Sequence, residues 1–383
     1  MPNHNAQPDN LPQKPPILVE TPEALAHLVE RLTEQPRIAI DTESNSLYAY
    51  KEQVCLIQIS VPDSDYLVDP FALEDLSPLG PILASTEIEK IFHAADYDLI
   101  VLQRDYGFTC GSLFDTMWAA RILGWPRVGL ANLLEEQFGV HVNKKFQRYN
   151  WGRRPLDAQA VRYARMDTHY LLELREIEAQ ALRERGRWQE AQEVFDYLRR
   201  HIAEPPIHDV ASTFWRIKGL QGLSNREKHW LYQLHWWREA TAERLDRPSF
   251  KVLGDRRLVA LARSQPRSRK ELKATGLTHH QVRRFGRGIL NALRTKTKPL
   301  PPRPQEGERP PDEVVERYNV LHGWRKQVAA GRGVDSDVIL PNATLWALAW
   351  HPPTSKAELI EVPGIGPWRQ ETYGADILAL VGQ

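Results

Sequence analysis

Two acidic residues at the end of an apolar segment are the first feature of this sequence with catalytic potential. Asp41 and Glu43 follow Ile38-Ala39-Ile40, which has the composition of a buried strand. Residues i and i+2 of a strand project to the same side, so the spacing predicts that both carboxylates face one point. Carboxylates held close together are either protonated or neutralised by a cation, and oxygen ligands favour Mg²⁺ or Mn²⁺. A solvated strand end with two charges is the alternative for this pair taken alone.

A second acidic cluster lies where a predicted strand, residues 90–93, passes into a helix that begins near Asp96. Asp96 is explained as a helix cap, because exposed amides and the helix dipole stabilise a carboxylate there. Asp98 is followed by two apolar residues and is harder to explain as a cap. We therefore take Asp98 as a candidate metal ligand, with Asp96 as its competitor. His93 is either a neighbour of this centre or a histidine satisfied in the core.

A third pair, Tyr163 and Asp167, lies within a long helix predicted from residue 156 to about residue 186. The i, i+4 spacing puts the phenol and the carboxylate on one helix face, one turn apart. On an amphipathic helix, each of these residues alone would more often lie at the surface.

The elements that must position these residues form an α/β domain. Residues 54–60 and 65–68 are predicted strands joined by a turn, so with the strand before Asp41 they form an antiparallel meander. Strands then alternate with helices, which predicts a mixed five-stranded sheet with flanking helices. Expected helix ends are an N-cap at Thr21, an N-cap at Asp115, and a stop at Gly139 after a helix over 130–138.

A basic loop follows between residues 141 and 155, where five Lys and Arg residues alternate with a Phe, a Tyr and a Trp. Cations contact phosphates and aromatic rings stack on bases, whereas a merely solvated basic loop needs no aromatic residues. The predicted RNA contacts in this loop are Lys144, Lys145, Gln147, Arg148, Trp151 and Arg154.

The composition of the 383 residues sets further bounds. Hydrophobic residues make up 42% and charged residues 26%, which is ordinary for a soluble protein of two or three domains. The two cysteines, Cys55 and Cys110, cannot form a disulfide framework, so a reducing cytoplasm is expected. Residues 1–16 are rich in Asn, Gln and Pro and are expected to be a disordered tail. No apolar run approaches the roughly 18 residues of a membrane span.

The near-neutral net charge of +1 conceals a strong asymmetry. Residues 211–298 contain 21 Lys and Arg against 6 Asp and Glu, so this block carries +15 and the remaining chain −14. Such segregation favours a polyanion-binding module on an acidic body, although an Arg-rich helical domain that is simply soluble is the alternative. The predicted phosphate contacts in this block are Arg256, Arg257, Arg283 and Arg284.

The C-terminal half contains an internal repeat. Leu234-His-Trp-Trp-Arg is echoed by Leu321-His-Gly-Trp-Arg at an offset of 87 residues, and Gly276 is echoed by Gly364 at an offset of 88. We predict two copies of one small all-helical unit, joined by a Pro-rich linker over 298–311. The second copy carries 6 basic and 9 acidic residues, which favours packing against the rest of the protein over nucleic-acid contact.

Taken together, the three acidic motifs resemble a known family. A strand ending D-x-E, an Asp at a strand-to-helix junction and a helix with Y-x-x-x-D are typical of DEDD exonucleases with a ribonuclease-H-like fold, in the branch that has Tyr in its third motif. The surrounding segments 38–43, 55–59, 91–99, 113–116 and 151–164 are similar to ribonuclease D. The repeated units resemble HRDC domains. The implied organisation is a tail over 1–16, an exonuclease domain over 17–205, HRDC domains over 206–297 and 312–383, and a linker over 298–311.

The resemblance implies a two-metal 3′→5′ exoribonuclease that binds the single-stranded 3′ end of structured RNA such as a tRNA precursor, acts as a monomer and releases nucleoside 5′-monophosphates. Asp41, Glu43 and Asp167 would hold one Mg²⁺ or Mn²⁺, and Asp41 and Asp98 the second. Tyr163, with an unperturbed pKa near 10, would orient the attacking water. Gln58 and His93 would lie beside this centre.

Two alternatives remain at this point. One is a DNA 3′→5′ exonuclease of the same superfamily, which would leave the HRDC-like units without an evident purpose. The other is a non-catalytic RNA-binding scaffold. The presence of all four acids and of Tyr163 argues against the scaffold, because a dead site usually lacks one ligand.

Overall fold

The chain divides into two compact units. In this computed structural model, unit 1 comprises Met1–Ser44, Val54–Pro205 and Pro310–Gln383, and unit 2 comprises Asn45–Gln53 and Pro206–Arg309. The structure describes residues 12, 14–142, 144–202, 209–295, 298–303 and 309–382, so most of the expected tail and part of the expected linker lie outside it. The first helical copy thus belongs to unit 2, whereas the second shares unit 1 with the sheet.

The sheet of unit 1 is mixed, as expected, but it has six described strands where the sequence predicts five. Their order is β1-β4-β3-β2-β5-β6. The pairs β2–β3 and β3–β4 are antiparallel, and β1–β4, β2–β5 and β5–β6 are parallel. The strands are β1 (Ile17–Val19), β2 (Arg37–Ser44), β3 (Val54–Val61), β4 (Ser64–Val68), β5 (Glu89–Phe92) and β6 (Leu113–Asp115). β1 and β6 have three residues each, too few to show an alternating pattern.

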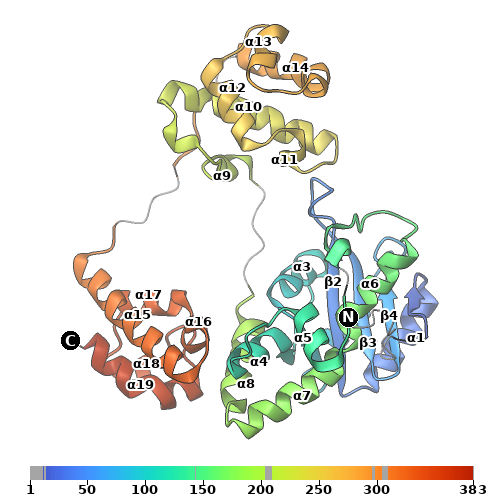
Figure 1. Ribbon diagram of the computed structural model, residues 1–383, viewed down its shortest axis with the longest axis vertical. Coiled ribbons are helices and arrows are strands. Elements are labelled where there is room, and N and C mark those ends of the chain that lie inside the picture. The colour runs from blue at the N-terminus through green and yellow to red at the C-terminus, as the bar shows by residue number, and fades with distance from the viewer. Residues whose placement is uncertain are drawn as a thin grey trace, which may run out of the picture. The chain divides into compact units, whose positions relative to one another are not determined.

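Helices cover this sheet. They are α1 (Pro22–Thr33), α2 (Leu79–Ala84), α3 (Asp96–Tyr106), α4 (Thr116–Leu123), α5 (Leu130–Phe138), the 3₁₀ turn η1 (Lys144–Arg148), α6 (Ala158–His169), α7 (Leu171–Glu184) and α8 (Trp188–Arg200). α6 packs on β2, β3 and β4 (Figure 1). Asp115 and Thr21 are N-caps and Gly139 ends α5, as predicted.

The prediction of a single long helix from residue 156 to about residue 186 is wrong. The chain bends at Tyr170, between α6 and α7, although no Pro or Gly marks the position. The two halves pack differently, because α6 lies on β2, β3 and β4 whereas α7 also contacts α4 and β5. Tertiary contacts of this kind leave no local signal in the sequence.

Unit 2 is an all-helical body with its own core around Phe214, Leu231 and Leu258. It includes residues 45–53, which connect β2 to β3. Tyr50 N donates to Asp246 Oδ1 at 3.0 Å, and Lys251 Nζ lies 3.8 Å from the ring centroid of Tyr48. Its helices are α9 (Val210–Phe214), the 3₁₀ turn η2 (Leu220–Gly222), α10 (Asn225–Arg244), α11 (Ser249–Val252), α12 (Asp255–Ser264), α13 (Arg269–Ala274) and α14 (His279–Arg294).

The second helical copy packs on α4 and α8 within unit 1. Arg332 donates to both carboxylate oxygens of the fully buried Glu190, and Arg121 pairs with Asp337. The copy consists of α15 (Asp312–Arg332), α16 (Ser336–Ile339), α17 (Asn342–Trp350), α18 (Lys356–Leu359) and α19 (Pro367–Val381). None of the described helices is long and apolar enough to span a membrane.

Candidate active site

The end of β2 carries the first two acids. Ile38, Ala39 and Ile40 are fully buried, and they fix the strand so that Asp41 pairs with Gln58 and Glu43 pairs with Leu56 of β3. Both carboxylates open into a cavity of about 430 Å³. The cavity is lined by Asp41, Thr42, Glu43, His93, Gly129, Leu130, Ala131, Asn132, Val142, Gln147, Tyr163 and Asp167.

The structure brings Asp98, and not Asp96, to this centre. Asp98 lies in the first turn of α3 with 7% of its surface exposed, and Thr42 donates to its Oδ1 from the backbone N at 3.0 Å and from Oγ1. Asp96 is not the helix cap that the sequence suggests, because Ala95 holds that position without a side-chain bond. Burial raises the pKa of Asp96 above its ordinary value, although the charge of the nearby Arg121 offsets part of this rise.

Helix α6 presents Tyr163 and Asp167 to the same cavity, as the i, i+4 spacing predicts. Burial, together with the charges of Asp167, Glu43 and Asp41, raises the pKa of Tyr163 well above its ordinary value. The phenol therefore keeps its proton at neutral pH, so Tyr163 can donate a hydrogen bond and orient a bound molecule but is a poor general base.

The four acids perturb one another strongly. Burial and the charges of the neighbouring carboxylates raise the pKa of Asp41 and of Asp167 well above the ordinary value, and raise that of Glu43 to about 9. Burial raises the pKa of Asp98 to about 7, against the hydrogen bonds from Thr42. In the described parts of the chain, none of the four forms an ion pair with Lys, Arg or His.

This donor set fits divalent cations. Asp98 is buried and the other three carboxylates are partly buried, and without a protein counter-charge the cluster needs either protons or cations. Hard oxygen ligands select Mg²⁺ or Mn²⁺. Both amide atoms of the fully buried Gln58, opposite Asp41, also have no partner within the described residues. No three His, Cys, Asp or Glu side chains in the described ranges are already arranged around one point.

His93 lines the cavity and is neutral at pH 7. Burial lowers its pKa to about 4. Thr116 Oγ1 donates to the carbonyl of Phe92 at 3.1 Å and lies 2.9 Å from His93 Nδ1, so it accepts the Nδ1 proton. The Nε2 atom of the ring is then an acceptor. The sequence left open whether His93 belongs to the site or to the core, and the structure places it in the lining of the cavity.

Trp151 and Phe146 of the basic loop are buried and are not RNA-stacking platforms, which corrects the prediction for Trp151. Its ring is 1% exposed and lies 6.2 Å from the Tyr163 ring, and Phe146 lies 5.8 Å from the same ring. These rings form the wall that holds Tyr163. Arg154 is also unavailable to RNA, because it pairs with the buried Asp69 and donates to the carbonyl of Cys55 at 2.7 Å.

The remaining predicted RNA contacts are placed as follows. Gln147 is exposed and lines the cavity, and Lys145 and Arg148 are exposed beside it in η1. The side chain of Lys144 lies outside the described parts.

On unit 2 the predicted phosphate contacts Arg256, Arg257, Arg283 and Arg284 are all exposed. Arg284 lines a cavity of about 220 Å³ together with Arg247 and Lys251, two cations that the sequence reasoning did not single out.

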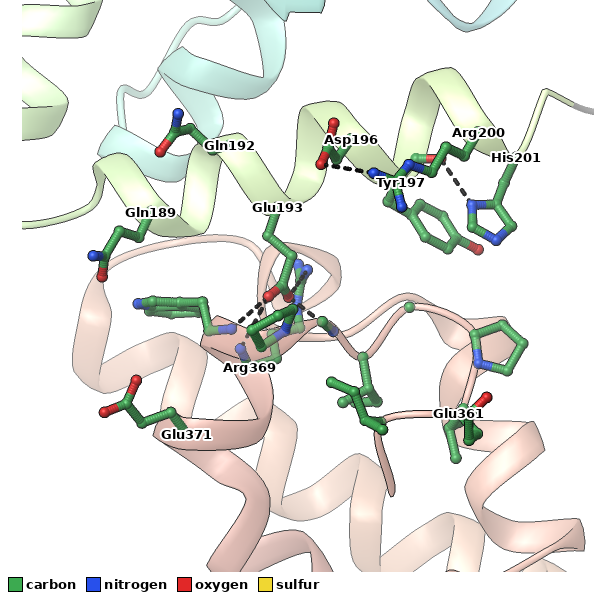
Figure 2. A pocket seen from close by; sticks show the side chains of 18 residues that line it. Gln189, Gln192, Glu193, Asp196, Tyr197, Arg200, His201, Glu361, Arg369 and Glu371 are labelled. Carbon is green, nitrogen blue, oxygen red and sulfur yellow. Dashed lines mark hydrogen bonds and ion pairs between the residues drawn. The ribbon is translucent and has the colours of Figure 1, made fainter. Parts of the chain in front are cut away.

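A second cleft, of about 690 Å³, lies between α8 and the second helical copy (Figure 2). Glu193 of α8 reaches across it and accepts hydrogen bonds from the backbone N of Gly366 (3.1 Å), Trp368 (2.7 Å) and Arg369 (3.3 Å) and from Arg369 Nη1 (3.0 Å). The carboxylate thus caps the N-terminus of α19. Sequence reasoning missed this residue, because nothing within α8 marks Glu193 as a cap for a distant helix.

Family models match both halves of the chain. A model described as a 3′-5′ exonuclease matches residues 16–181, and a model of the HRDC domain matches residues 227–293 and 315–381. The fold and the site therefore define a 3′→5′ exonuclease with two HRDC domains.

The relatives narrow this class. Ribonuclease D of Desulfotalea psychrophila is 31% identical over 72% of this chain and 74% of its own length, and ribonuclease D of Gluconacetobacter diazotrophicus is 29% identical over 95% and 92%. Protein RRP6-like 3 of Arabidopsis thaliana is 45% identical over 41% of this chain, but the match spans only 18% of that protein.

The solved structure of Escherichia coli RNase D, an exoribonuclease involved in structured RNA processing, has a TM-score of 0.66 and 25% identity, over 96% of this chain and 99% of that one. The chain belongs to the ribonuclease D family. It is accordingly a 3′→5′ exoribonuclease that acts on RNA and depends on divalent metal ions.

Proposed function

We propose that this protein trims the single-stranded 3′ ends of structured RNAs, with tRNA precursors as the principal substrates, and releases nucleoside 5′-monophosphates. The observation that carries the proposal is the set of four carboxylates with raised pKa values and no counter-charge, beside a cavity that also holds the protonated Tyr163. The cavity of about 430 Å³ suits a terminal nucleotide of a single strand better than a duplex.

Each residue has a distinct role in this proposal. Asp41, Glu43 and Asp167 would hold one Mg²⁺ or Mn²⁺, and Asp41 and Asp98 the other. Such ions supply positive charge that activates water and stabilises the leaving oxygen of a phosphodiester. Tyr163 keeps its proton and donates a hydrogen bond that orients the water or the scissile phosphate. Thr42 holds Asp98 in place by two hydrogen bonds to its Oδ1.

The basic surface of unit 2 supports an RNA substrate larger than a short oligonucleotide. Arg247, Lys251 and Arg284 line one cavity with His280, and none of these three cations forms an ion pair with another described residue. Phosphate contacts of this kind give affinity without reading bases. The folded body of a tRNA offers such phosphates, whereas the acidic centre of unit 1 admits only the trimmed strand.

We further propose that the protein works as a monomer in the cytoplasm. Both cysteines are buried and neither forms a disulfide within the described residues, which suits a reducing compartment. The catalytic residues, the basic surface and the carboxylate cluster all come from one chain, so the proposed reaction needs no second copy.

The test is digestion of a 3′-extended tRNA by the wild-type protein with Mg²⁺, with Mn²⁺ and with EDTA, next to Asp41→Asn and Asp98→Asn. We expect metal-dependent shortening from the 3′ end that stops in both variants, while RNA binding persists. Asp96→Asn is the matched control and should retain activity, because Asp96 is not among the groups whose charges raise the pKa of Asp41, Glu43 or Asp167. A wild-type protein that binds the RNA without shortening it under any metal would support the scaffold alternative.

The DNA alternative is addressed by a parallel digestion of RNA and DNA oligomers of the same sequence. Faster cleavage of the DNA oligomer would favour a DNA exonuclease. Equal shortening of a tRNA and of an unstructured RNA, without a difference in affinity, would argue against structured RNA as the preferred substrate class.

A further inference from the structure

Helix α6 carries the catalytic pair Tyr163 and Asp167 on one face and is held from another face by a single buried carboxylate. Asp65, in β4, has 4% of its surface exposed, and Arg165 and Thr168 of α6 have 8% and 1%. Asp65 lines no part of the active-site cavity. Its carboxylate is instead engaged by Arg165, His169 and Ser60, so we assign it a supporting role and no contact with RNA or with a cation.

The Asp65 carboxylate accepts hydrogen bonds from two elements. Arg165 Nε donates to Oδ2, and His169 Nδ1 lies 2.9 Å from the same oxygen. Ser60 Oγ of β3 donates to Oδ1 at 2.7 Å and also lies 2.7 Å from Thr168 Oγ1. These contacts fill most of the roughly four acceptor positions of a carboxylate. Through these hydrogen bonds α6 is joined to both β3 and β4 at Thr168, the residue next to Asp167.

The charge state of Asp65 makes these bonds strong. Burial works to raise its pKa, but the hydrogen bonds from His169 and Ser60 and the charge of Arg165 lower it below its ordinary value. Asp65 is thus an anion at neutral pH, and His169 must donate to it. Hydrogen bonds in which one partner is charged are roughly twice as strong as neutral ones. The guanidinium of Arg165 also donates to the carbonyl of Lys14.

The geometry of α6 transmits this anchoring to the site. Asp167 and Thr168 are adjacent on a rigid helix, and Tyr163 lies two residues before Arg165. A rotation of α6 that breaks the Asp65 contacts therefore displaces both catalytic side chains together. Catalytic groups must be held within about 0.5 Å and 10–20° of their productive arrangement.

We propose that Asp65 is a positioning residue of the exonuclease centre, which fixes the rotation of α6 and thereby the distance of Asp167 and Tyr163 from Asp41 and Glu43. This inference rests on the proposed two-cation chemistry for its consequence. Removal of such a supporting group typically costs about 10–100-fold in metal affinity or activity.

The experiment compares Asp65→Asn with wild type in the full-length, metal-free protein. Calorimetry with Mn²⁺ measures metal affinity, and digestion of a 3′-extended RNA at saturating Mn²⁺ gives kcat and KM. We expect a dissociation constant for Mn²⁺ raised roughly 10–100-fold and a lower kcat, with KM for RNA changed less than about threefold.

The matched control is Glu89→Gln in β5. Glu89 holds the buried Arg175 through two hydrogen bonds at 2.7 and 3.0 Å, so the variant also loses a carboxylate that pairs with a buried guanidinium. Glu89 also pairs with Arg37 at the start of β2, and neither contact involves α6. The control should lower the melting temperature but leave the Mn²⁺ affinity within about twofold of wild type. Equal Mn²⁺ affinity in both variants would overturn the positioning role.

A milder variant covers the case in which Asp65→Asn does not fold. Thr168→Val keeps the shape of the side chain and removes the hydrogen bonds of its hydroxyl to Ser60 and to the carbonyl of Arg165. We expect roughly a threefold to tenfold weaker Mn²⁺ affinity, and a folded variant with wild-type affinity would contradict the proposal. A wild-type protein that binds Mn²⁺ but cleaves no RNA would refute the proposed function, while the affinity comparison would still decide the role of Asp65.

Discussion

The buried carboxylates predict that the metal-free protein loses stability as the pH rises. The ordinary pKa of a Glu side chain is 4.5, which we take for the unfolded chain, and that of Glu43 is raised to about 9 in the folded protein by burial and by the charges of Asp167 and Asp98. A carboxyl group whose pKa is raised by folding binds its proton more tightly in the folded state. Its contribution is fully present below pH 4.5 and is lost as the pH rises toward 9.

The magnitude follows from the linkage between proton binding and folding. Between pH 6.5 and 8.0 the loss from Glu43 alone is about 2 kcal/mol, because each pKa unit is worth about 1.4 kcal/mol. A change of this size lowers the melting temperature by roughly 4–8 °C in a domain of 150–250 residues. His93, whose pKa burial lowers from 6.5 to about 4, titrates only in the unfolded state at the lower edge of this window, so it offsets the loss by less than about 1 kcal/mol.

The assay is a thermal melt in EDTA at pH 6.5, 7.0, 7.5 and 8.0, for wild type and Glu43→Gln. The melting temperature of the variant should fall less steeply, because the charge that is costly to bury is absent. With saturating Mg²⁺ or Mn²⁺ the wild-type slope should disappear, since cations neutralise the cluster and stabilise the folded state by mass action. A metal-free wild type whose melting temperature is flat, or parallel to that of Glu43→Gln, would refute the reasoning.

Three further predictions concern residues outside the carboxylate cluster. Glu193→Ala should lower the free energy of unfolding by about 1–3 kcal/mol, measured by urea denaturation, because backbone donors at the start of α19 lose their acceptor. Trp151→Ala should lower the free energy of unfolding by about 3–5 kcal/mol, and it should also reduce kcat because the ring supports Tyr163. Replacing Arg283 and Arg284 by Glu should weaken the binding of a tRNA and reduce the slope of log K against log salt concentration by about two. The affinity for a short single strand should change little.

Controls distinguish these effects from general damage. Glu193→Gln keeps an acceptor and should lose less stability than Glu193→Ala. An unchanged kcat in folded Trp151→Ala would show that the aromatic wall has no part in positioning Tyr163. Lys326→Glu reverses an exposed charge on the second helical copy, and an equal loss of tRNA affinity there would indicate a nonspecific effect of net charge.

The parts of the site that could be predicted are those encoded by local spacing. The i, i+2 pair on β2 and the i, i+4 pair on α6 face one cavity because strand and helix geometry alone decide it. Caps such as Asp115, which accepts from the backbone N of Trp118 at 3.0 Å, are equally local.

The errors arise where tertiary packing decides. Trp151 and Arg154 have the composition of an RNA-binding loop, but the ring completes the core beside Tyr163 and the guanidinium is taken by Asp69. Whether a basic aromatic loop faces solvent or core depends on the volume left by other elements, which no window of the sequence contains. The same reason explains the bend at Tyr170 and the assignment of residues 45–53 to unit 2.

The two helical copies show how a repeat predicts a shared fold but not a shared surface. In the first copy Thr278 caps α14, and its Oγ1 accepts from the backbone N of Gln281 at 3.2 Å. The position 88 residues later is Gly366, which has no side chain to serve as a cap. A Cβ there would lie 2.3 Å from Glu193 Cδ, so only glycine admits the carboxylate that replaces the missing cap. The second copy therefore depends on α8 for the start of its last helix. The first copy supplies the cap of its own last helix, and its predicted phosphate contacts Arg256, Arg257, Arg283 and Arg284 are exposed.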